Sequence, residues 1–422
     1  MESIEVLVAH IQGLSRSPDE VSHLHSLLKQ SEDALRSHAA RLAPFLSQLD
    51  PSIHTLGYLF LLEAYSSGSI SGEEASGFLL TVVEFINSCS AEQIQLAPEK
   101  FISVCKSFKD QVMQLGVPMQ GIAPLWMAVR KLQTSTEQLT TLHSDYLLLC
   151  LLAKCYKAGL SILDDDIFEV DHPRDHFLYC YYGGMINIGL KRFEKALACL
   201  HNVVTAPMTT LNAICVEAYK KYILVSLILN GQVPSFPKYT SSAAHRNLKN
   251  YTQPYVDLAN FYASGKFSEL EACIQTNQEK FLSDSNLGLV KQVLSSLYKR
   301  NIQRLTQTYL TLSLQDIANV AQLNNPKEAE MHVLQMIQDG EIFATINQKD
   351  GMVSFHEDPE QYKSCGMTEH IDFSIQRLMA LSKKLSSLDD NLSCDPQYLS
   401  KVGKERQKFD FDEFDSVSHK FM

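Results

Sequence analysis

The chain has 422 residues, of which 45% are hydrophobic, and its formal net charge is −11. This length allows two or three domains, and the apolar content suffices for a large core. The negative charge disfavours broad binding to nucleic acid or to an anionic membrane surface. Glu2 and Glu5 interrupt the start of the chain, so we expect no signal peptide, and apolar runs such as Tyr222–Leu229 are too short to cross a bilayer.

Residues 1–140 show the pattern of successive helices separated by short polar breaks. Ser17 precedes a proline and two acidic residues, which is typical of a helix start. Residues 50–51 and 66–72 have the composition of loops. No motif with a chemical function stands in this region, so the pattern predicts a set of N-terminal helical repeats that serves as a scaffold.

Residues 141–300 carry a loose repeat. The segment 181–200, YYGGMINIGLKRFEKALACL, resembles a tetratricopeptide unit, with Gly184 where the two helices pack closely. Similar polar breaks precede four apolar residues that are separated by 37, 40 and 34 positions, namely Tyr156, Phe193, Val233 and Phe267. This spacing is typical of helix-turn-helix solenoids, in which each unit must stack on its neighbours to bury its apolar side. The pattern predicts a right-handed, tetratricopeptide-like solenoid.

A basic-edged helical stretch follows at residues 287–310. Its Lys and Arg residues suggest either phosphate binding or a solvated face whose charges pair with acidic residues elsewhere: Lys291, Lys299, Arg300 and Arg304. Clustered basic residues alone are a weak signal for phosphate, so we favour the second interpretation.

Residues 301–358 have the order of a winged helix. Ser313 and the Asn325-Pro326 pair predict two helix starts, and Gly340 predicts the end of the second helix. Alternating apolar residues on either side of Asp350-Gly351 then predict a hairpin with a two-residue turn, in which Ile346 lies opposite Phe355.

This winged helix lacks the charge of a DNA reader. Between Pro326 and His356 stand two basic residues, Lys327 and Lys349, against five acidic ones. A surface that repels phosphate lacks the electrostatic term that dominates DNA binding. We therefore expect the hairpin to pair edge to edge with another protein. The residues assigned to this surface are Ile342, Ser354, through an outward backbone group, and Phe355.

The C-terminal region predicts an amphipathic helix over residues 368–393, after a break at Asp358-Pro359. Its apolar stripe recurs every three to four residues and is assigned to partner binding: Ile371, Ile375, Leu378, Leu381, Leu385, Leu388 and Leu392. The helix either folds back on its own domain or joins a bundle with other chains. Residues 394–422 have no helical period, so we expect a disordered tail, and its interleaved charges and aromatic residues suggest a docking peptide.

A helical solenoid that leads into a winged helix without DNA-binding charge resembles the PCI-domain family. That family forms the scaffolds of the proteasome lid, the COP-nine signalosome and translation initiation factor three. Four blocks are similar to the subunit-three branch of the signalosome, and the similarity extends over about residues 50–393: Cys180–Ile186, Glu217–Ile228, Gly288–Ala318 and Glu328–Phe355. A domain organisation follows, with helical repeats at 1–140 and 141–300, the PCI helical part from about 195, and the winged helix at 301–358.

The resemblance implies a non-catalytic scaffold subunit of the complex that removes the Nedd modifier from the cullins of RING ubiquitin ligases. It implies a location in nucleus and cytoplasm, a C-terminal helical bundle with other signalosome subunits, and contact with cullin-RING ligases through the complex. No cofactor, metal, nucleic acid or membrane is expected. The alternatives are a scaffold subunit of the proteasome lid or of the initiation factor, and a nucleic-acid-binding regulator is disfavoured by the charges.

In the family, the zinc peptidase motif belongs to a different subunit and reads His-x-His, seven residues, Ser-x-x-Asp. This chain has His23 and His25, but Asp33 and Arg36 stand where the serine and the aspartate would be. An arginine cannot replace a metal ligand, and positions i and i+2 of a helix point to different faces.

The remaining candidates for chemistry are also weak. Cys150 and Cys155 lack the spacing of zinc ligands, and all ten cysteines are typical of reduced thiols without disulfides. The acidic run at 164–172 suggests a weak cation or basic-partner site, but more often such a run is a solvated loop. No phosphate-binding or nucleophile motif is present, so we expect no enzymatic activity.

Overall fold

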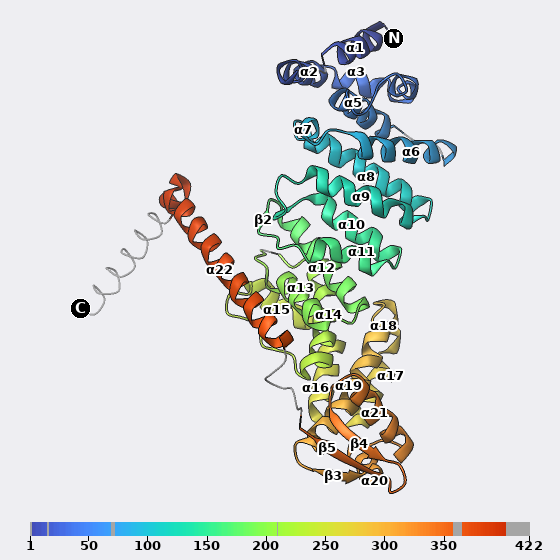
Figure 1. The fold of residues 1–422 in the computed structure, drawn as a ribbon, viewed down its shortest axis with the longest axis vertical. Coiled ribbons are helices and arrows are strands. Elements are labelled where there is room, and N and C mark those ends of the chain that lie inside the picture. Colours follow the sequence, from blue (N-terminus) through green and yellow to red (C-terminus); the bar gives the residue numbers. More distant parts are fainter. Residues whose placement is uncertain (1, 15–16, 69–71, 209, 358–364, 402–422) are drawn as a thin grey trace, which may run out of the picture. The chain divides into compact units, whose positions relative to one another are not determined.

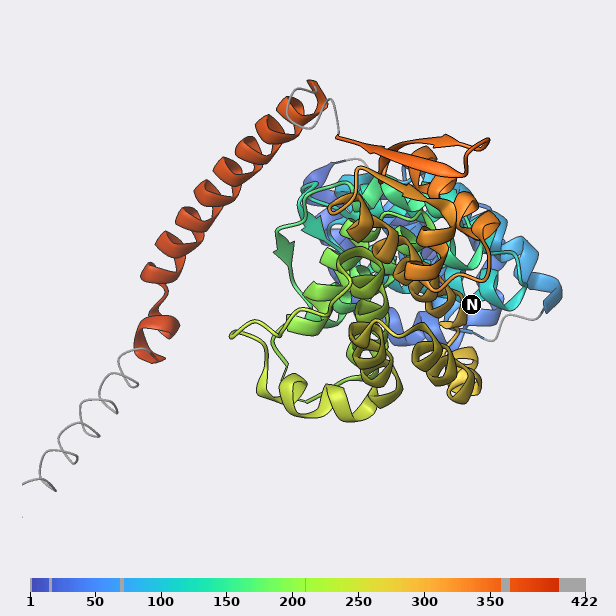
Figure 2. The same ribbon diagram turned by 90° about the horizontal axis from the view of Figure 1, so that it is seen from below.

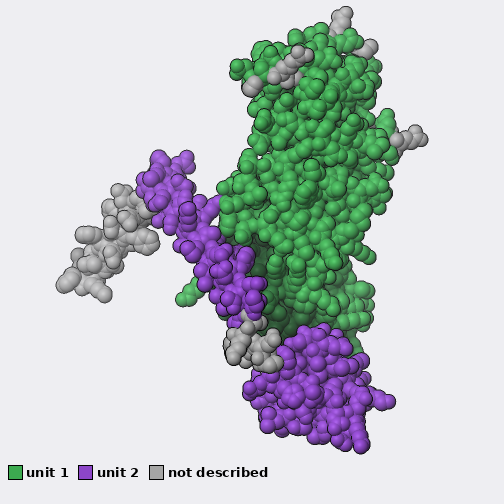
Figure 3. All heavy atoms as spheres, in the orientation of Figure 1, with its two compact units in different colours: residues 1–302 green, residues 303–422 purple. Residues whose placement is uncertain are grey.

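The computed structural model describes residues 2–14, 17–68, 72–208, 210–357 and 365–401. The chain divides into two compact units, residues 1–302 and 303–422 (Figure 3). Helices dominate both units, which confirms the predicted mainly helical fold. No helix in these described segments is both long and apolar enough to span a membrane.

The first unit is a stack of helices in chain order (Figure 1). Two short parallel strands, β1 (Gln138–Leu139) and β2 (Glu169–Val170), pair beside the stack. The last helix extends a few residues into the second unit. The helices are α1 (Glu2–Gly13), α2 (Pro18–Gln30), α3 (Glu32–Ser37), η1 (Ala39–Arg41), α4 (Ala43–Leu46), α5 (Thr55–Ser66), α6 (Gly72–Ser88), α7 (Ala91–Ile94), α8 (Pro98–Gln114), α9 (Pro118–Leu132), α10 (Thr141–Leu152), α11 (Tyr156–Leu163), α12 (Pro173–Gly189), α13 (Phe193–Thr205), α14 (Ala213–Asn230), α15 (Ser242–Tyr251), α16 (Gln253–Ser264), α17 (Phe267–Thr276), α18 (Gln278–Ser283) and α19 (Leu287–Thr306).

The stack is held by helices that are covered on several sides. In α5 every residue from Thr55 to Ala64 is buried, and α14 is buried continuously from Ala218 to Leu227. Such helices show almost no amphipathic pattern, because neighbours before and after them in the stack cover opposite faces. The predicted close approach at Gly184 is confirmed, since a Cβ there would lie 3.0 Å from Leu200 Cδ2.

Three of the four repeat markers stand at helix starts, as a helical repeat requires. Tyr156, Phe193 and Phe267 are the first residues of α11, α13 and α17. Val233 is different, because it lies in an irregular segment after Gly231 ends α14. The prolines that follow Val233 disfavour a helix at this point, so the next helix begins only at Ser242.

The second unit contains the predicted winged helix, built from α20 (Leu314–Ala321), α21 (Pro326–Gln338) and the strands β3 (Thr311–Ser313), β4 (Phe343–Asn347) and β5 (Met352–His356). The predicted helix starts are confirmed. The Asp316 amide donates to Ser313 Oγ at 3.0 Å, and the Glu328 amide donates to Asn325 Oδ1 at 2.9 Å.

The hairpin register differs from the prediction. Ile346 lies opposite Val353, and Phe355 lies opposite Ala344, because the turn has four residues rather than two. Asn347 causes the difference: its Oδ1 accepts hydrogen bonds from the amides of Lys349 and Asp350. This side-chain turn begins the reversal two residues early, and Gly351 supplies the positive φ of 63° that completes it. A shift of two residues leaves each side chain on its predicted face.

The strand β3 was not predicted. It pairs antiparallel with β5, so the sheet order is β3-β5-β4 and β5 is the central strand. The hairpin of β4 and β5 is the pair of orange arrows in Figure 2. Beyond the hairpin, α22 (Cys365–Cys394) is a single helix of 30 residues that contains the predicted amphipathic segment. Residues 396–401 are also helical, contrary to the expectation of disorder there, and residues 402–422 of the predicted tail lie outside the described residues.

Candidate interaction surfaces

Two of the three residues assigned to the hairpin surface are part of the core. The side chains of Ile342 and Phe355 are 5% and 6% exposed, so they pack inside the winged helix and are not available to a partner. The alternation of inward and outward residues was predicted correctly, but inward residues hold the sheet to its helices. Their assignment as contact residues was therefore wrong.

Ser354 is also unavailable, because it lies on the central strand. The Phe355 amide donates to the Leu310 carbonyl at 2.8 Å, on the β3 side of the sheet. Backbone groups alternate sides along a strand, so the amide of Ser354 faces β4, with which it is paired. The prediction of an outward backbone group at Ser354 was wrong, because β3 occupies the edge that the sequence pattern had left open.

The free backbone groups of the hairpin lie on β4, its outer strand. Because Thr345 and Ser354 face each other, the amides and carbonyls of the neighbouring residues Ala344 and Ile346 point away from β5. No other strand among the described residues pairs with this edge. The edge of β4 therefore presents the unpaired donors and acceptors that another strand requires.

The outer face of α21 carries two large apolar side chains beside a single basic residue, Lys327. Met331 and Leu334 are 58% and 48% exposed, and they lie three residues apart on one side of the helix. Glu330 interacts with Gln348 at the hairpin turn. This composition suits contact with protein and gives no attraction to phosphate.

The stripe of α22 is exposed along its whole length. Not one residue of this helix is buried, and its Ile and Leu side chains are between 39% and 68% exposed: Ile371, Ile375, Leu378, Leu381, Leu385, Leu388 and Leu392. Four members, Ile371, Leu378, Leu385 and Leu392, follow at intervals of seven residues. A seven-residue interval keeps the side chains on one seam of a helix that packs along another helix.

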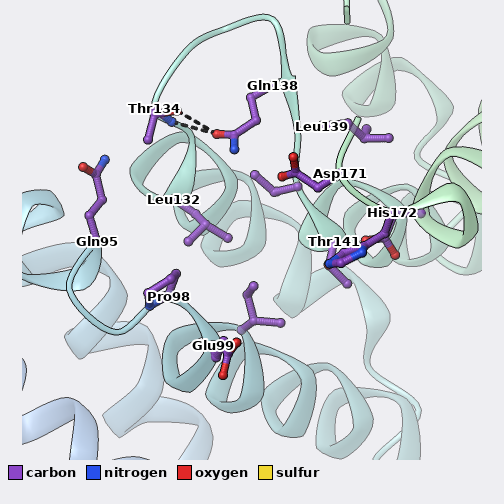
Figure 4. A pocket seen from close by; sticks show the side chains of 13 residues that line it. Gln95, Pro98, Glu99, Leu132, Thr134, Gln138, Leu139, Thr141, Asp171 and His172 are labelled. Atoms are coloured by element: carbon purple, nitrogen blue, oxygen red, sulfur yellow. Dashed lines mark hydrogen bonds between the residues drawn. The ribbon is translucent and has the colours of Figure 1, made fainter. Parts of the chain in front are cut away.

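A small pocket lies where α8, α10 and α12 begin, next to β1 and β2 (Figure 4). It has a volume of about 260 Å³, with Pro98, Leu132 and Leu139 on its apolar side. The Thr134 amide and hydroxyl donate to Gln138 Oε1 at 3.1 and 2.9 Å (Figure 4). These contacts fix the loop that forms one wall.

The acidic residues of this pocket have a structural explanation. Glu99 and Asp175 lie in the first turns of α8 and α12, where negative charge stabilises a helix. Asp175 is 8% exposed and accepts a hydrogen bond of 2.7 Å from the Thr141 hydroxyl, which joins α12 to α10. We see no arrangement of nucleophile, base and oriented third group here.

Residues considered for metal or redox chemistry are separated or buried. His23 is exposed and His25 is half-buried on α2. No cluster of His, Cys, Asp or Glu within the described ranges has the geometry to hold a metal ion. Burial raises the pKa of Cys150 to about 11, which leaves its thiol protonated and unreactive, and all ten cysteines are free thiols.

The acidic run is tied to basic residues of neighbouring helices. Lys195 Nζ lies 2.7 Å from Asp164 Oδ1, and Arg130 lies 2.9 Å from Asp165 Oδ2. These ion pairs fix the segment between α11 and α12, so two of its carboxylates are already partnered. This favours the loop interpretation over a cation site.

The basic stretch is also partly explained by internal contacts. The Arg300 guanidinium donates to the carbonyls of Asn230 and Leu229 at 2.7 and 3.2 Å. These carbonyls end α14, where a cation interacts favourably with unpaired carbonyl groups. Arg300 therefore joins α19 to α14. Sequence spacing does not predict this contact, because the two carbonyls lie 70 and 71 positions earlier in the chain.

The comparisons with known proteins agree with this architecture. A family model described as COP9 signalosome complex subunit 3, N-terminal helical repeats, matches residues 18–244, and a PCI domain model matches residues 272–357. The chain is 60% identical to COP9 signalosome complex subunit 3 of Arabidopsis thaliana over 423 residues, which cover 100% of this chain and 99% of that protein. It is 38% identical to COP9 signalosome complex subunit 3 of Dictyostelium discoideum, with 90% and 92% of the two chains covered.

These matches do not favour the proteasome lid or the initiation factor. The chain belongs to the family of COP9 signalosome complex subunit 3, whose members combine N-terminal helical repeats with a PCI domain.

Proposed function

We propose that the chain is a non-catalytic scaffold subunit of a COP9 signalosome, the complex that removes the Nedd modifier from cullins, and that it reaches cullin-RING ligases only through that complex. The family to which it belongs supports the proposal. The observation that carries it is the exposed stripe of α22, because an amphipathic helix without a covered face needs a partner.

The energy available from this stripe is large. Full burial of one Ile or Leu side chain contributes about 1.5–3 kcal/mol, so the stripe offers roughly 10–20 kcal/mol before ordering entropy is subtracted. The first seam residues, Ile371 and Leu378, lie one heptad apart, which suits a bundle of helices from several subunits. We propose that α22 enters such a bundle.

The winged helix supplies the second contact. The outward backbone groups of Ala344 and Ile346 on β4 can pair with a strand from a neighbouring PCI subunit. The exposed Met331 and Leu334 on α21 would add apolar contact area. Backbone pairing fixes the orientation of the neighbour, whereas the bundle supplies most of the buried area.

Co-expression with the other signalosome subunits tests the role of α22. The double substitution Leu378→Asp with Leu385→Asp places two charges on the seam, and we expect it to abolish co-purification. The matched control, Gln376→Asp with Lys383→Asp, also introduces two aspartates seven positions apart, but on the opposite side of the helix. This variant should co-purify normally. Normal assembly of the Leu378→Asp, Leu385→Asp variant would contradict the proposal.

A further inference from the structure

A groove in the N-terminal repeats carries donors that the scaffold role does not use. It lies between α2, α5 and the start of α8, which are neighbours in the stack (Figure 1), and its volume is about 540 Å³. Phe60 is buried beneath it, and Leu96, which is 41% exposed, stands at its side. The groove is therefore open to solvent but has an apolar wall.

Most charges in the groove are paired with each other. Lys100 Nζ lies 3.0 Å from Glu32 Oε2 and 3.1 Å from Glu63 Oε2. Arg36 Nη2 lies 3.6 Å from Glu63 Oε1 and 3.9 Å from Glu32 Oε2. Two acids and two bases thus neutralise one another, and Lys100 also lies 5.2 Å from the centre of the Phe60 ring.

Two donors on α2 are left over. Lys29 is exposed and forms no ion pair with any described residue, and His25 lies one turn before it on the same face. The Nε2 atom of His25 is buried and has no hydrogen-bond partner among the described residues. A buried polar atom without a partner costs free energy, so this position favours a group that can accept a hydrogen bond.

We propose that this groove binds the carboxylate of a Glu side chain in an extended segment of a partner protein. Lys29 supplies the charge, and a small rotation of the imidazole turns His25 Nε2 toward the carboxylate. The apolar residue next to the Glu lies against Leu96. The proposal is independent of the assembly surfaces on the second unit, so either one can fail without the other.

Protonation of His25 links the groove to pH. Burial, and then the charge of Lys29, lower the pKa of His25 in the free chain, while Glu32 raises it. The other charged groups around the groove are Arg36 on α3, Glu63 on α5, and Lys100 and the exposed Glu99 on α8. A bound carboxylate raises the pKa of His25, so binding takes up a proton and strengthens as pH falls.

Titration calorimetry on the full chain tests the proposal with two peptides, N-acetyl-Ala-Leu-Glu-Ala-amide and the same peptide with Gln in place of Glu. We expect the Glu peptide to bind at least about tenfold more tightly, because its carboxylate accepts a charge-assisted hydrogen bond and pairs with Lys29, whereas the neutral Gln amide does not. Its affinity should be higher at pH 6 than at pH 8, and His25→Gln should remove that difference. Equal affinity for both peptides, or no measurable binding of either, would overturn the proposal.

Substitutions with opposite expected effects exclude a merely structural role. Lys29→Ala should weaken binding of the Glu peptide about tenfold, whereas Lys29→Arg should retain it. Glu99→Gln should strengthen binding, because it removes an exposed negative charge that repels the peptide. Lys106→Ala, on an exposed position of α8 outside the groove, is the control and should have no effect. Unchanged affinity in both the Lys29→Ala and Glu99→Gln variants would contradict the assignment.

Discussion

At the scale of single residues, Gly57 sets the distance between α1 and α5. A Cβ at this position would lie 2.3 Å from Ile11 Cγ2 and 2.7 Å from Ile11 Cγ1, and Ile11 is fully buried. We expect Gly57→Ala to lower the free energy of unfolding by about 1–3 kcal/mol through overpacking. Gly77→Ala is the control, because Gly77 has open space around it inside α6, and it should raise that free energy by up to about 1 kcal/mol. Urea unfolding measures both, and equal effects would contradict the packing argument.

Asp284, at the end of α18, contacts residues of two other helices, α14 and α16. Lys220 lies 2.9 Å from its Oδ1, and the Tyr255 hydroxyl donates to its Oδ2 at 2.8 Å. Burial raises the pKa of Asp284, but these two hydrogen bonds outweigh burial and hold the pKa below its usual value. Asp284→Asn should lower the free energy of unfolding at pH 7 by about 1–3 kcal/mol, because Lys220 loses one of its two carboxylate partners.

The same residue gives a pH dependence of defined sign. A carboxyl group whose pKa is depressed by folding contributes stability above its unfolded pKa, and that contribution is lost as pH falls through the folded pKa. The difference in stability between the wild-type chain and the Asp284→Asn variant should therefore shrink as pH is lowered from 5 toward 3. Glu279→Gln, at an exposed position of α18, is the control. A difference that stays constant over this range would show that the charge of Asp284 is not involved.

At the scale of elements, local signals were reliable wherever one side chain decides the outcome. The caps at Ser313 and Asn325 were predicted because an oxygen at that position satisfies a free amide of the first turn. The hairpin length was not, because Asn347 competes with Asp350-Gly351 for control of the turn. The strand β3 was missed because three residues between two helices carry no period, and their pairing with β5 depends on the tertiary fold.

The position of β3 changes which substitutions test pairing at the hairpin. Proline at Ala344 removes an amide that points away from the sheet, so the fold should persist while pairing with a partner strand weakens. Proline at the neighbouring Thr345 removes an amide that faces β5 and should destabilise the winged helix. Thermal melting of the free chain and co-purification with signalosome subunits distinguish the two effects. Wild-type assembly of a folded Ala344→Pro variant would show that the β4 edge is not used.

At the scale of the whole molecule, the sequence predicted the class of each part better than its contacts. Solenoid and winged helix follow from periodicity, which is local. Arg300 caps α14 by binding a carbonyl that lies 70 positions earlier in the chain. Asp284 pairs with Lys220, which lies on a different helix. No spacing rule reveals either contact. The stripe of α22 was predicted in full, but only the structure shows that all seven side chains stay exposed.

The exposed stripe of α22 leads to a last prediction, which compares the 422-residue chain with a shortened variant. A variant that ends at Glu357 lacks α22, and since no side chain of α22 is buried, its removal should change the free energy of unfolding by less than about 0.5 kcal/mol. The full chain should self-associate at high concentration through its apolar stripe, whereas the shortened chain and the Leu378→Asp, Leu385→Asp variant should remain monomeric. Sedimentation velocity and thermal melting measure the two properties. A large fall in melting temperature on truncation would mean that α22 covers part of its own chain in solution, and the helix would then stabilise the fold instead of providing a free surface for assembly.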